Sequence, residues 1–177
     1  NIIEKYIGIV KGYMTTVHAY TNDQAMLDVA HKKGINARRG RAGAANIVPS
    51  STGAASALGL VIPSLNGKLD GGALRVPTPT GSVVDLTLEL KRNTSVEEIN
   101  KLFTDNQNET IKITMDPIVS SDIIGSNLGA LVDGQLTKVL EVDGKQLVKI
   151  VSWYDNEMSY STQMVRTALY IGRLMGK

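Results

Sequence analysis

The chain has 177 residues, of which 42% are hydrophobic and 20% charged, so it is long enough for one sizeable core and is expected to form one domain. Its formal net charge of +2 is too small to indicate nucleic acid as the main partner, and its apolar runs stay below the roughly 18 residues of a membrane span. The absence of cysteine excludes disulfides and thiolate zinc sites within the chain, which favours a cytoplasmic location.

The first part of the chain predicts a strand, a loop and a short helix. Residues 7–20 are β-rich and predict a strand that carries His18 at its end. Residues 31–46 combine glycine, alanine and basic residues without apolar periodicity, which predicts a long exposed loop. Residues 49–63, PSSTGAASALGLVIP, place small and apolar residues at helical spacing and stop at a proline, so a short buried helix is expected there.

The next segment predicts a strand followed directly by a helix. Residues 81–91, GSVVDLTLELK, alternate between apolar and polar side chains, as a strand with one covered face does. Ser95 and Glu98 have the spacing of a capping box, and the apolar residues after them recur at helical spacing. An amphipathic helix is therefore expected from Ser95 onward.

The last part of the chain predicts a hairpin and a helix. Residues 137–153 form two apolar runs around Asp143 and Gly144, a pair that suits the positive φ angles of a two-residue hairpin turn. The stripe of Met164, Ala168, Ile171 and Met175 predicts a helix that covers the sheet. The expected fold class is α+β, with a mostly antiparallel, mixed sheet and helices packed on one face.

His18 is the first candidate for chemistry. An imidazole has an unperturbed pKa near neutrality, and a strand end followed by polar residues suits the rim of an active site. A hydrogen-bonded structural histidine is the alternative interpretation. The other histidine, His31, lies in the predicted loop, where exposure is expected. No histidines or carboxylates have metal-ligand spacing, so no metal site is predicted.

Several residues suit the binding of an anion. Arg39 lies in a cluster with the arginines at positions 38 and 41, and a guanidinium fork fits phosphate, although a solvated basic surface is the alternative. Thr52 and Gly53 lie at the expected start of a helix, where backbone amides favour an anion. Arg75 interrupts an apolar strand-like segment closed by two prolines and needs an anionic partner if buried.

The quoted motifs also resemble a known family when they are taken together. GYMTTVHAYTNDQ, RRGRAGAANIVPSSTGAA, LNGKL, ALRVPTPTGSVVDLT and VKIVSWYDNE resemble, in this order, the catalytic domain of phosphorylating glyceraldehyde-3-phosphate dehydrogenase. The resemblance covers essentially all 177 residues. It implies an NAD-dependent enzyme of glycolysis that converts D-glyceraldehyde 3-phosphate, inorganic phosphate and NAD to 1,3-bisphosphoglycerate and NADH through a cysteine thioester.

The resemblance also implies roles for individual residues. His18 matches the catalytic base, which activates the cysteine and serves as acid and base around hydride transfer. The substrate-phosphate site matches Thr21, Asp23 and Arg75, and the inorganic-phosphate site matches Thr52, Gly53 and Arg39. Asn156, in the strand-to-helix junction SWYDNEMSY, matches the residue that binds the nicotinamide carboxamide; helix capping is its alternative role.

Residues 1–177 are then expected to form the catalytic domain, with the family's S-loop at about 28–47 lining the cofactor site and contacting a neighbour in a homotetramer. The chain contains no GxGxxG fingerprint and no cysteine, so the NAD-binding domain and the nucleophile are expected to be absent from it. The resemblance therefore implies an inactive fragment of a larger enzyme. Two alternatives remain: an erythrose-4-phosphate dehydrogenase domain, and a non-catalytic binding or interaction module.

Overall fold

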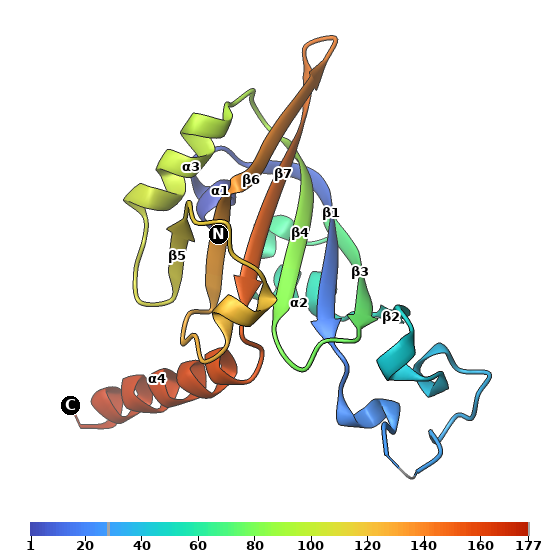
Figure 1. Ribbon diagram of the computed structural model, residues 1–177. Coiled ribbons are helices and arrows are strands. Elements are labelled where there is room, and N and C mark those ends of the chain that lie inside the picture. Colours follow the sequence, from blue (N-terminus) through green and yellow to red (C-terminus); the bar gives the residue numbers. More distant parts are fainter. Residues whose placement is uncertain (28, 177) are drawn as a thin grey trace.

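A computed structural model describes residues 1–27 and 29–176, and within them one seven-stranded sheet has the strand order β2-β3-β1-β4-β7-β6-β5 (Figure 1). The pairs β1–β3 and β5–β6 are parallel and the other pairs are antiparallel, which confirms the predicted mixed, mostly antiparallel sheet. The strands are β1 (Ile9–Ala19), β2 (Val48–Ser51), β3 (Leu69–Val76), β4 (Ser82–Leu90), β5 (Ile111–Thr114), β6 (Ala130–Val142) and β7 (Lys145–Tyr154).

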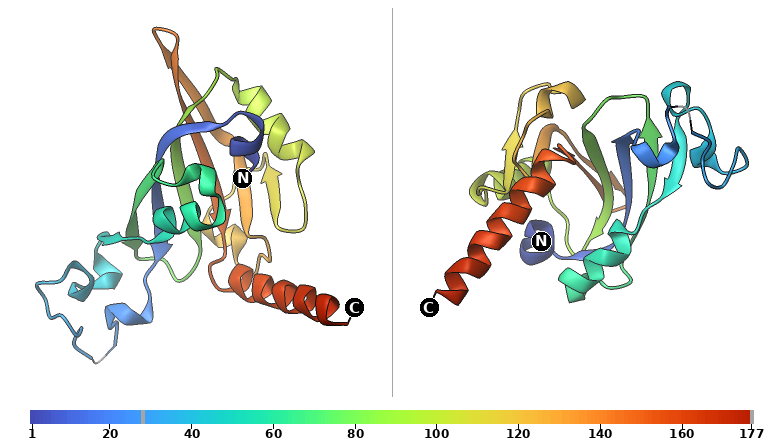
Figure 2. Two further views of the ribbon diagram at one scale, coloured as in Figure 1. Left: turned by 180° about the vertical axis from the view of Figure 1, so that it is seen from behind. Right: turned by 90° about the horizontal axis from the view of Figure 1, so that it is seen from below.

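The helices differ in how they meet the sheet. Seen from behind, α1 and α2 lie in front of one sheet face, whereas α4 runs away from the sheet (Figure 2). None of the helices in the described ranges combines the length and apolar character that a bilayer crossing requires. The α-helices are α1 (Ile2–Tyr6), α2 (Ala54–Val61), α3 (Val96–Asp105) and α4 (Met158–Met175), and the short 3₁₀ helices are η1 (Asn22–Gln24), η2 (Arg38–Gly40), η3 (Gly43–Ala45), η4 (Pro63–Leu65) and η5 (Ser120–Ile123).

The core lies where α1, α3 and η4 meet the strands. Ser95 caps α3 as expected, because its Oγ accepts a hydrogen bond from the Glu98 amide at 3.2 Å. This start turns Ile99 and Phe103 inward, where they are 0% and 6% exposed and join a cluster with core residues of β4, β6 and β7. The apolar face of β4 contributes Leu88 to the same cluster. The predicted strand and the helix that follows it are both confirmed.

Replacing Ile99 by alanine is expected to lower the free energy of unfolding by about 2–5 kcal/mol, because it leaves a cavity in a site with no solvent exposure. Leu60→Ala is the matched control, since Leu60 is 86% exposed and its truncation should change stability by less than about 0.5 kcal/mol. Urea unfolding followed by circular dichroism measures both changes. Equal effects of the two substitutions would contradict the assignment of the core.

The predicted hairpin joins β6 and β7. Asp143 and Gly144 have φ angles of 51° and 72°, and the ladder continues on both sides of them from the pair Val142–Lys145. Both central residues therefore adopt the positive φ that the sequence pattern predicts.

The sequence correctly predicts helix α2 but not its burial. The helix ends at Val61, two residues before Pro63, as expected, and Gly53 occupies its N-cap position. Leu60 and Val61 are 86% and 79% exposed, so the prediction of a buried helix is wrong for these side chains. The helix contacts β3 on one face of the sheet, and its other side stays open to solvent.

Helix α4 also forms where the sequence predicts it, but it does not cover the sheet. It extends away from the sheet in every view, and Met164 and Ile171 of its apolar stripe are 57% and 48% exposed (Figures 1 and 2). The prediction of a covering helix is therefore wrong in this chain. A helical apolar stripe specifies a surface that requires cover, but not which surface supplies it.

Candidate functional site

The register of four neighbouring strands places polar side chains side by side at one end of the sheet. His18 on β1 pairs with Arg75 on β3 and with Ser82 on β4, and Ser82 pairs in turn with Tyr154 on β7. Because directly paired residues point to the same face, these side chains form a row across that face. The sequence prediction that His18 lies at a strand end is confirmed.

Hydrogen bonds orient the His18 ring within this row. Its Nδ1 lies 2.8 Å from the Ser82 hydroxyl and 3.3 Å from the Tyr154 hydroxyl, and the Ser82 hydroxyl also donates to Asn156 Oδ1 at 3.2 Å. The Tyr154 ring meets the imidazole edge-to-face, with an interplanar angle of 81° and a centroid separation of 6.0 Å. The second ring nitrogen, Nε2, makes no hydrogen bond within residues 1–27 and 29–176, which leaves it available to a reactant.

The surroundings of His18 favour its neutral form. Burial lowers the pKa of His18 below its ordinary value of 6.5, and the positive charges of Arg75 and Arg39 lower that pKa further. Below pH 6.5 the unfolded chain therefore binds more protons than the folded chain, so this residue reduces the free energy of unfolding as the pH falls. A neutral imidazole near pH 7 is the state required of a general base.

Thr21, Asp23 and Arg39 form one polar cluster next to this row. Arg39 Nε donates to Asp23 Oδ2 at 2.8 Å, its Nη2 forms an ion pair with the same carboxylate, and the Thr21 hydroxyl donates to Asp23 Oδ1. Burial of Asp23 opposes its ionisation, but the hydrogen bonds from Thr21 and Arg39 outweigh that effect and lower the pKa of Asp23. The charge of Arg39 is therefore partly neutralised by a neighbour within the chain.

The guanidinium group of Arg75 has fewer hydrogen-bond partners than that of Arg39. Its Nη1 donates to the Ala19 carbonyl at 3.1 Å, whereas its buried Nε has no hydrogen-bond partner within the described part of the chain. Burial lowers the pKa of Arg75, and repulsion from Arg39 lowers it further. A half-buried guanidinium with an unpaired N–H group beside a second arginine favours the binding of an anion.

The two predicted anion sites remain separate in this chain. Val48 of β2 pairs with Arg75, whereas Ser51 pairs with Gly72, so Thr52 and Gly53 follow the end of β2 that lies roughly 10 Å further along the sheet. Thr52 Oγ1 accepts a hydrogen bond from the Ala54 amide at 3.2 Å. Arg39, which the resemblance groups with Thr52 and Gly53, forms hydrogen bonds with Asp23 and Thr21.

Asn156 is positioned by the residue that precedes it. The Asp155 carboxylate accepts hydrogen bonds from the amides of Glu157 and Met158 at 2.9 Å and from the Gly125 amide at 2.8 Å. Burial of Asp155 opposes its ionisation, but these backbone bonds outweigh it and lower the pKa of Asp155. Asp155, not Asn156, therefore accepts from the amides at the start of α4, and the Asn156 side chain is directed toward Ser82.

Sequence reasoning did not select Ser82 as a site residue. The sequence feature that could have identified it is its position in β4, an even number of residues from Leu86 and Leu88. Its hydroxyl therefore lies on the same face of the strand as these core side chains. Ser82 is 2% exposed, and a buried hydroxyl in an apolar phase requires a hydrogen-bond partner. The identity of that partner depends on the pairing of β1 with β4 and is not visible in the sequence.

The predicted loop at 28–47 borders the site on one side. Asp28 lies outside the described residues; the rest of the loop is mostly exposed and contains the short helices η2 and η3. Of its three clustered arginines, Arg39 is the one that reaches Asp23, and a hollow of about 600 Å³ beside it is lined by Lys33, Arg38 and Ser50, among others. The ion pair of Asp23 and Arg39 also lines this basic hollow.

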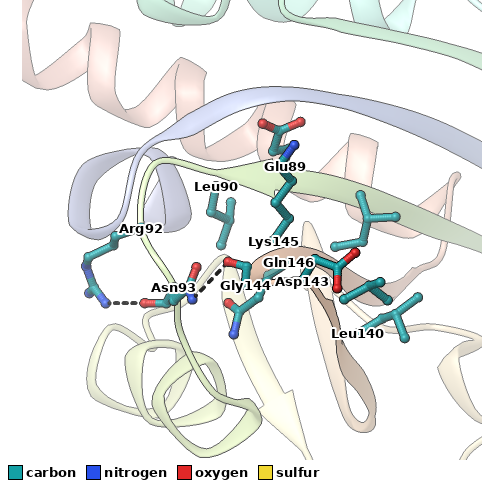
Figure 3. Close-up of a pocket in the computed structure, with 11 residues that line it drawn as sticks. Glu89, Leu90, Arg92, Asn93, Leu140, Asp143, Gly144, Lys145 and Gln146 are labelled. Carbon is teal, nitrogen blue, oxygen red and sulfur yellow. Dashed lines mark hydrogen bonds between the residues drawn. The ribbon is translucent and has the colours of Figure 1, made fainter.

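A second hollow lies at the opposite end of β4 from Ser82. Its volume is about 540 Å³, and its walls come from the end of β4 and from the β6–β7 hairpin (Figure 3). Arg92 donates to the Asn93 carbonyl at 3.2 Å and Asn93 Nδ2 donates to the Gly144 carbonyl at 3.4 Å (Figure 3). These bonds join the hairpin turn to the segment before α3, so the hollow is explained by local structure. Within the described ranges, no group of three or more metal-ligating side chains could hold a metal ion.

Sulfate is expected to raise the pKa of His18, because a bound dianion would offset the charges of Arg75 and Arg39 that lower it. Sulfate keeps its charge between about pH 5 and 8, where histidine titrates. The pKa is measured by NMR titration of the His18 ring with and without sulfate, at constant ionic strength. An unchanged pKa in saturating sulfate would show that the anion does not bind beside His18.

The sequence matches known proteins over almost its whole length. Residues 1–156 match the family "Glyceraldehyde 3-phosphate dehydrogenase, C-terminal domain". The chain is 62% identical over 167 residues to the glyceraldehyde-3-phosphate dehydrogenase of Streptococcus pyogenes, covering 94% of this chain and 49% of that protein. It is 56% identical over 173 residues to the enzyme of Clostridium pasteurianum, covering 98% of this chain and 52% of that protein. The chain thus spans about half the length of the curated relatives it matches, and it belongs to the family of glyceraldehyde-3-phosphate dehydrogenase C-terminal domains.

Proposed function

We propose that this chain is the catalytic domain of a cytoplasmic, NAD-dependent, phosphorylating glyceraldehyde-3-phosphate dehydrogenase of glycolysis. The observation that carries the proposal is the adjacency of an imidazole with an open Nε2 and an arginine with a buried, unpaired Nε. The first group can exchange a proton with a reacting atom, and the second can hold the phosphate of the same substrate. Family membership supports this combination of roles.

His18 would act as the acid and base of the reaction. Its Nε2 takes the proton of the attacking cysteine thiol, which this chain does not contain and which another part of the enzyme must supply. The thiolate bonds to the aldehyde carbon, and Nε2 returns its proton to the aldehyde oxygen to give a hydroxyl group. Nε2, neutral again, then accepts the proton of that hydroxyl group as the hydride leaves the carbon. Inorganic phosphate finally attacks the thioester carbonyl, releasing the thiolate and the acyl phosphate. The lowered pKa of His18 keeps the base neutral for the first step.

The arginines would orient the two phosphates. Arg75, which pairs with His18, would hold the phosphate at the far end of a three-carbon aldehyde together with Thr21 and Asp23. Arg39, together with Thr52 and Gly53 further along the sheet, is proposed to bind the attacking inorganic phosphate. Two anion sites at different positions suit a reaction that uses two phosphates, one on the aldehyde substrate and one that attacks the thioester.

The residues present also fit NAD, which would supply the hydride acceptor when bound. Asn156 Oδ1 accepts a hydrogen bond from Ser82, whereas its Nδ2 has no partner within the described residues and can donate to a carboxamide oxygen. We propose that residues 28–47 form the S-loop beside the cofactor and that the enzyme is a homotetramer. Residues 1–177 would together form the catalytic domain, with most contacts to NAD made by a separate nucleotide-binding domain.

The test joins this chain to the remaining half of the Streptococcus pyogenes enzyme, which it matches over 49% of that protein. The fusion is expected to form NADH from D-glyceraldehyde 3-phosphate only when phosphate is present, with the complete Streptococcus pyogenes enzyme as the positive control. A higher specificity constant for erythrose 4-phosphate would identify the alternative substrate. A folded fusion that binds NAD but forms no NADH from either aldehyde would refute the enzymatic proposal and leave a binding module.

A further inference from the structure

We propose that Ser82 is a positioning residue that fixes the His18 tautomer and the Asn156 amide orientation through one shared hydroxyl. The catalytic meaning of this inference rests on the proposed function, but the hydrogen-bond arrangement itself does not. Ser82 Oγ lies 2.8 Å from His18 Nδ1 and 3.2 Å from Asn156 Oδ1, so one oxygen joins the two side chains.

A count of donors and acceptors assigns the protons. A serine hydroxyl has one proton to donate, and an amide oxygen can only accept. Because Asn156 Oδ1 faces Ser82, the hydroxyl proton must point to that oxygen. Ser82 Oγ then accepts from His18, so Nδ1 carries the imidazole proton and Nε2 keeps its lone pair. The opposite amide orientation would reverse the chain of donors and leave Nε2 protonated, unable to act as a base.

The backbone holds all three residues in place. Ser82 pairs with His18 in the β1–β4 ladder and with Tyr154 in the β4–β7 ladder, and its side chain is 2% exposed. The Asp155 carboxylate fixes the turn that contains Asn156 through three backbone amides. Burial excludes water from the shared hydroxyl, so the bonds are not exchanged for solvent contacts.

The arginines and the carboxylate near His18 make no hydrogen bond to Ser82 within the described residues. They are Arg75 on β3, Arg39 on η2 and Asp23 paired with Arg39, and the ionisable Tyr154 on β7 also lies near His18. Removing the Ser82 hydroxyl leaves the two arginines and Asp23 unchanged and takes one hydrogen-bond partner from Tyr154, so a change in tautomer would report the loss of hydrogen bonds at Ser82. Tyr154, at 3.3 Å from Nδ1, is a weaker partner that can act as donor or acceptor and does not select one tautomer.

Nitrogen-15 NMR of the imidazole rings tests the proposal on the 177-residue chain, which has only two histidines. At a pH where His18 is neutral, its wild-type signals should show the Nδ1–H form. Ser82→Ala should shift the population toward Nε2–H, the form that a free imidazole prefers, and Ser82→Thr should restore Nδ1–H because it keeps the hydroxyl. The His31 ring, in the loop, is the internal control and should not respond.

The wild-type spectrum alone can overturn the proposal, because a predominant Nε2–H form of His18 contradicts the assignment even if Ser82→Ala fails to fold. An unchanged tautomer in a folded Ser82→Ala chain would also overturn it. In the fusion enzyme, Ser82→Ala should lower kcat by roughly 2- to 10-fold, as expected for one lost hydrogen bond, without changing the KM for phosphate. An inactive wild-type fusion with the Nδ1–H form would refute the proposed function and leave the role of Ser82 intact.

Discussion

Replacing His18 by glutamine is expected to lower kcat for phosphate-dependent NADH formation by about 10²–10⁴-fold in the fusion enzyme, the usual contribution of a positioned acid and base. Glutamine keeps a polar side chain of similar reach that can bond to Ser82, but it cannot exchange a proton near pH 7. The KM values for the aldehyde and for phosphate should change little, because Arg75 and the other anion-binding residues remain. Steady-state kinetics across a range of pH measures both parameters.

The control for this substitution is Lys101→Gln, at an exposed lysine on α3 that pairs with Asp105 and lies outside the site. It should leave kcat unchanged. The His18→Gln enzyme should also lose the acidic limb of its pH–rate profile, since the group that must be neutral is gone. If His18→Gln retained kcat within about threefold while folded, proton transfer by His18 would contribute too little to be general acid–base catalysis, and the assignment would be withdrawn.

Replacing Arg75 by alanine is expected to weaken the binding of inorganic phosphate at the substrate-phosphate site of the chain by about 10- to 100-fold, because hydrogen bonds to a charged group contribute about 1.5–3 kcal/mol. Arg75 should matter more than Arg39, since Asp23 already occupies much of the Arg39 guanidinium whereas Arg75 Nε has no partner in the described residues. Isothermal titration calorimetry with phosphate at low ionic strength measures the change.

Two further variants sharpen this test. Arg75→Lys keeps the charge but loses the planar fork, so its affinity should fall between those of the wild type and Arg75→Ala. Arg92→Ala is the matched control, because Arg92 pairs with Glu98 at the other end of β4 and should not affect phosphate binding. Equal losses in Arg75→Ala and Arg92→Ala would indicate nonspecific attraction to a basic chain. No loss in Arg75→Ala would remove Arg75 from the anion site.

Local structure was predictable wherever neighbouring residues along the chain decide it. The strand that carries His18, the cap of α3 by Ser95 and the hairpin turn at Asp143 and Gly144 all appear as predicted. The cap and the turn depend on interactions between residues a few positions apart, such as a side-chain oxygen facing a backbone amide or a positive φ that glycine accepts.

Burial was predicted less well than helix formation. The exposed residues Leu60 of α2 and Met164 of α4 belong to patterns that indicate apolar faces, yet those faces are not covered in this chain. Periodicity reports that one side of a helix is apolar, but the surface that covers it comes from distant residues, from another domain or from another subunit.

The sequence by itself determined the family, several of the strands and helices, and the chemical types of residue available to a site: an imidazole, several arginines, and short polar side chains. Only the tertiary structure decided that Arg75, His18 and Ser82 stand in one row, that Arg39 joins Asp23, and that Thr52 lies apart from them. These facts depend on the register of strands that are far apart along the chain. Register is set by the packing of the whole sheet against its core, because a shift of one residue would turn every side chain to the opposite face.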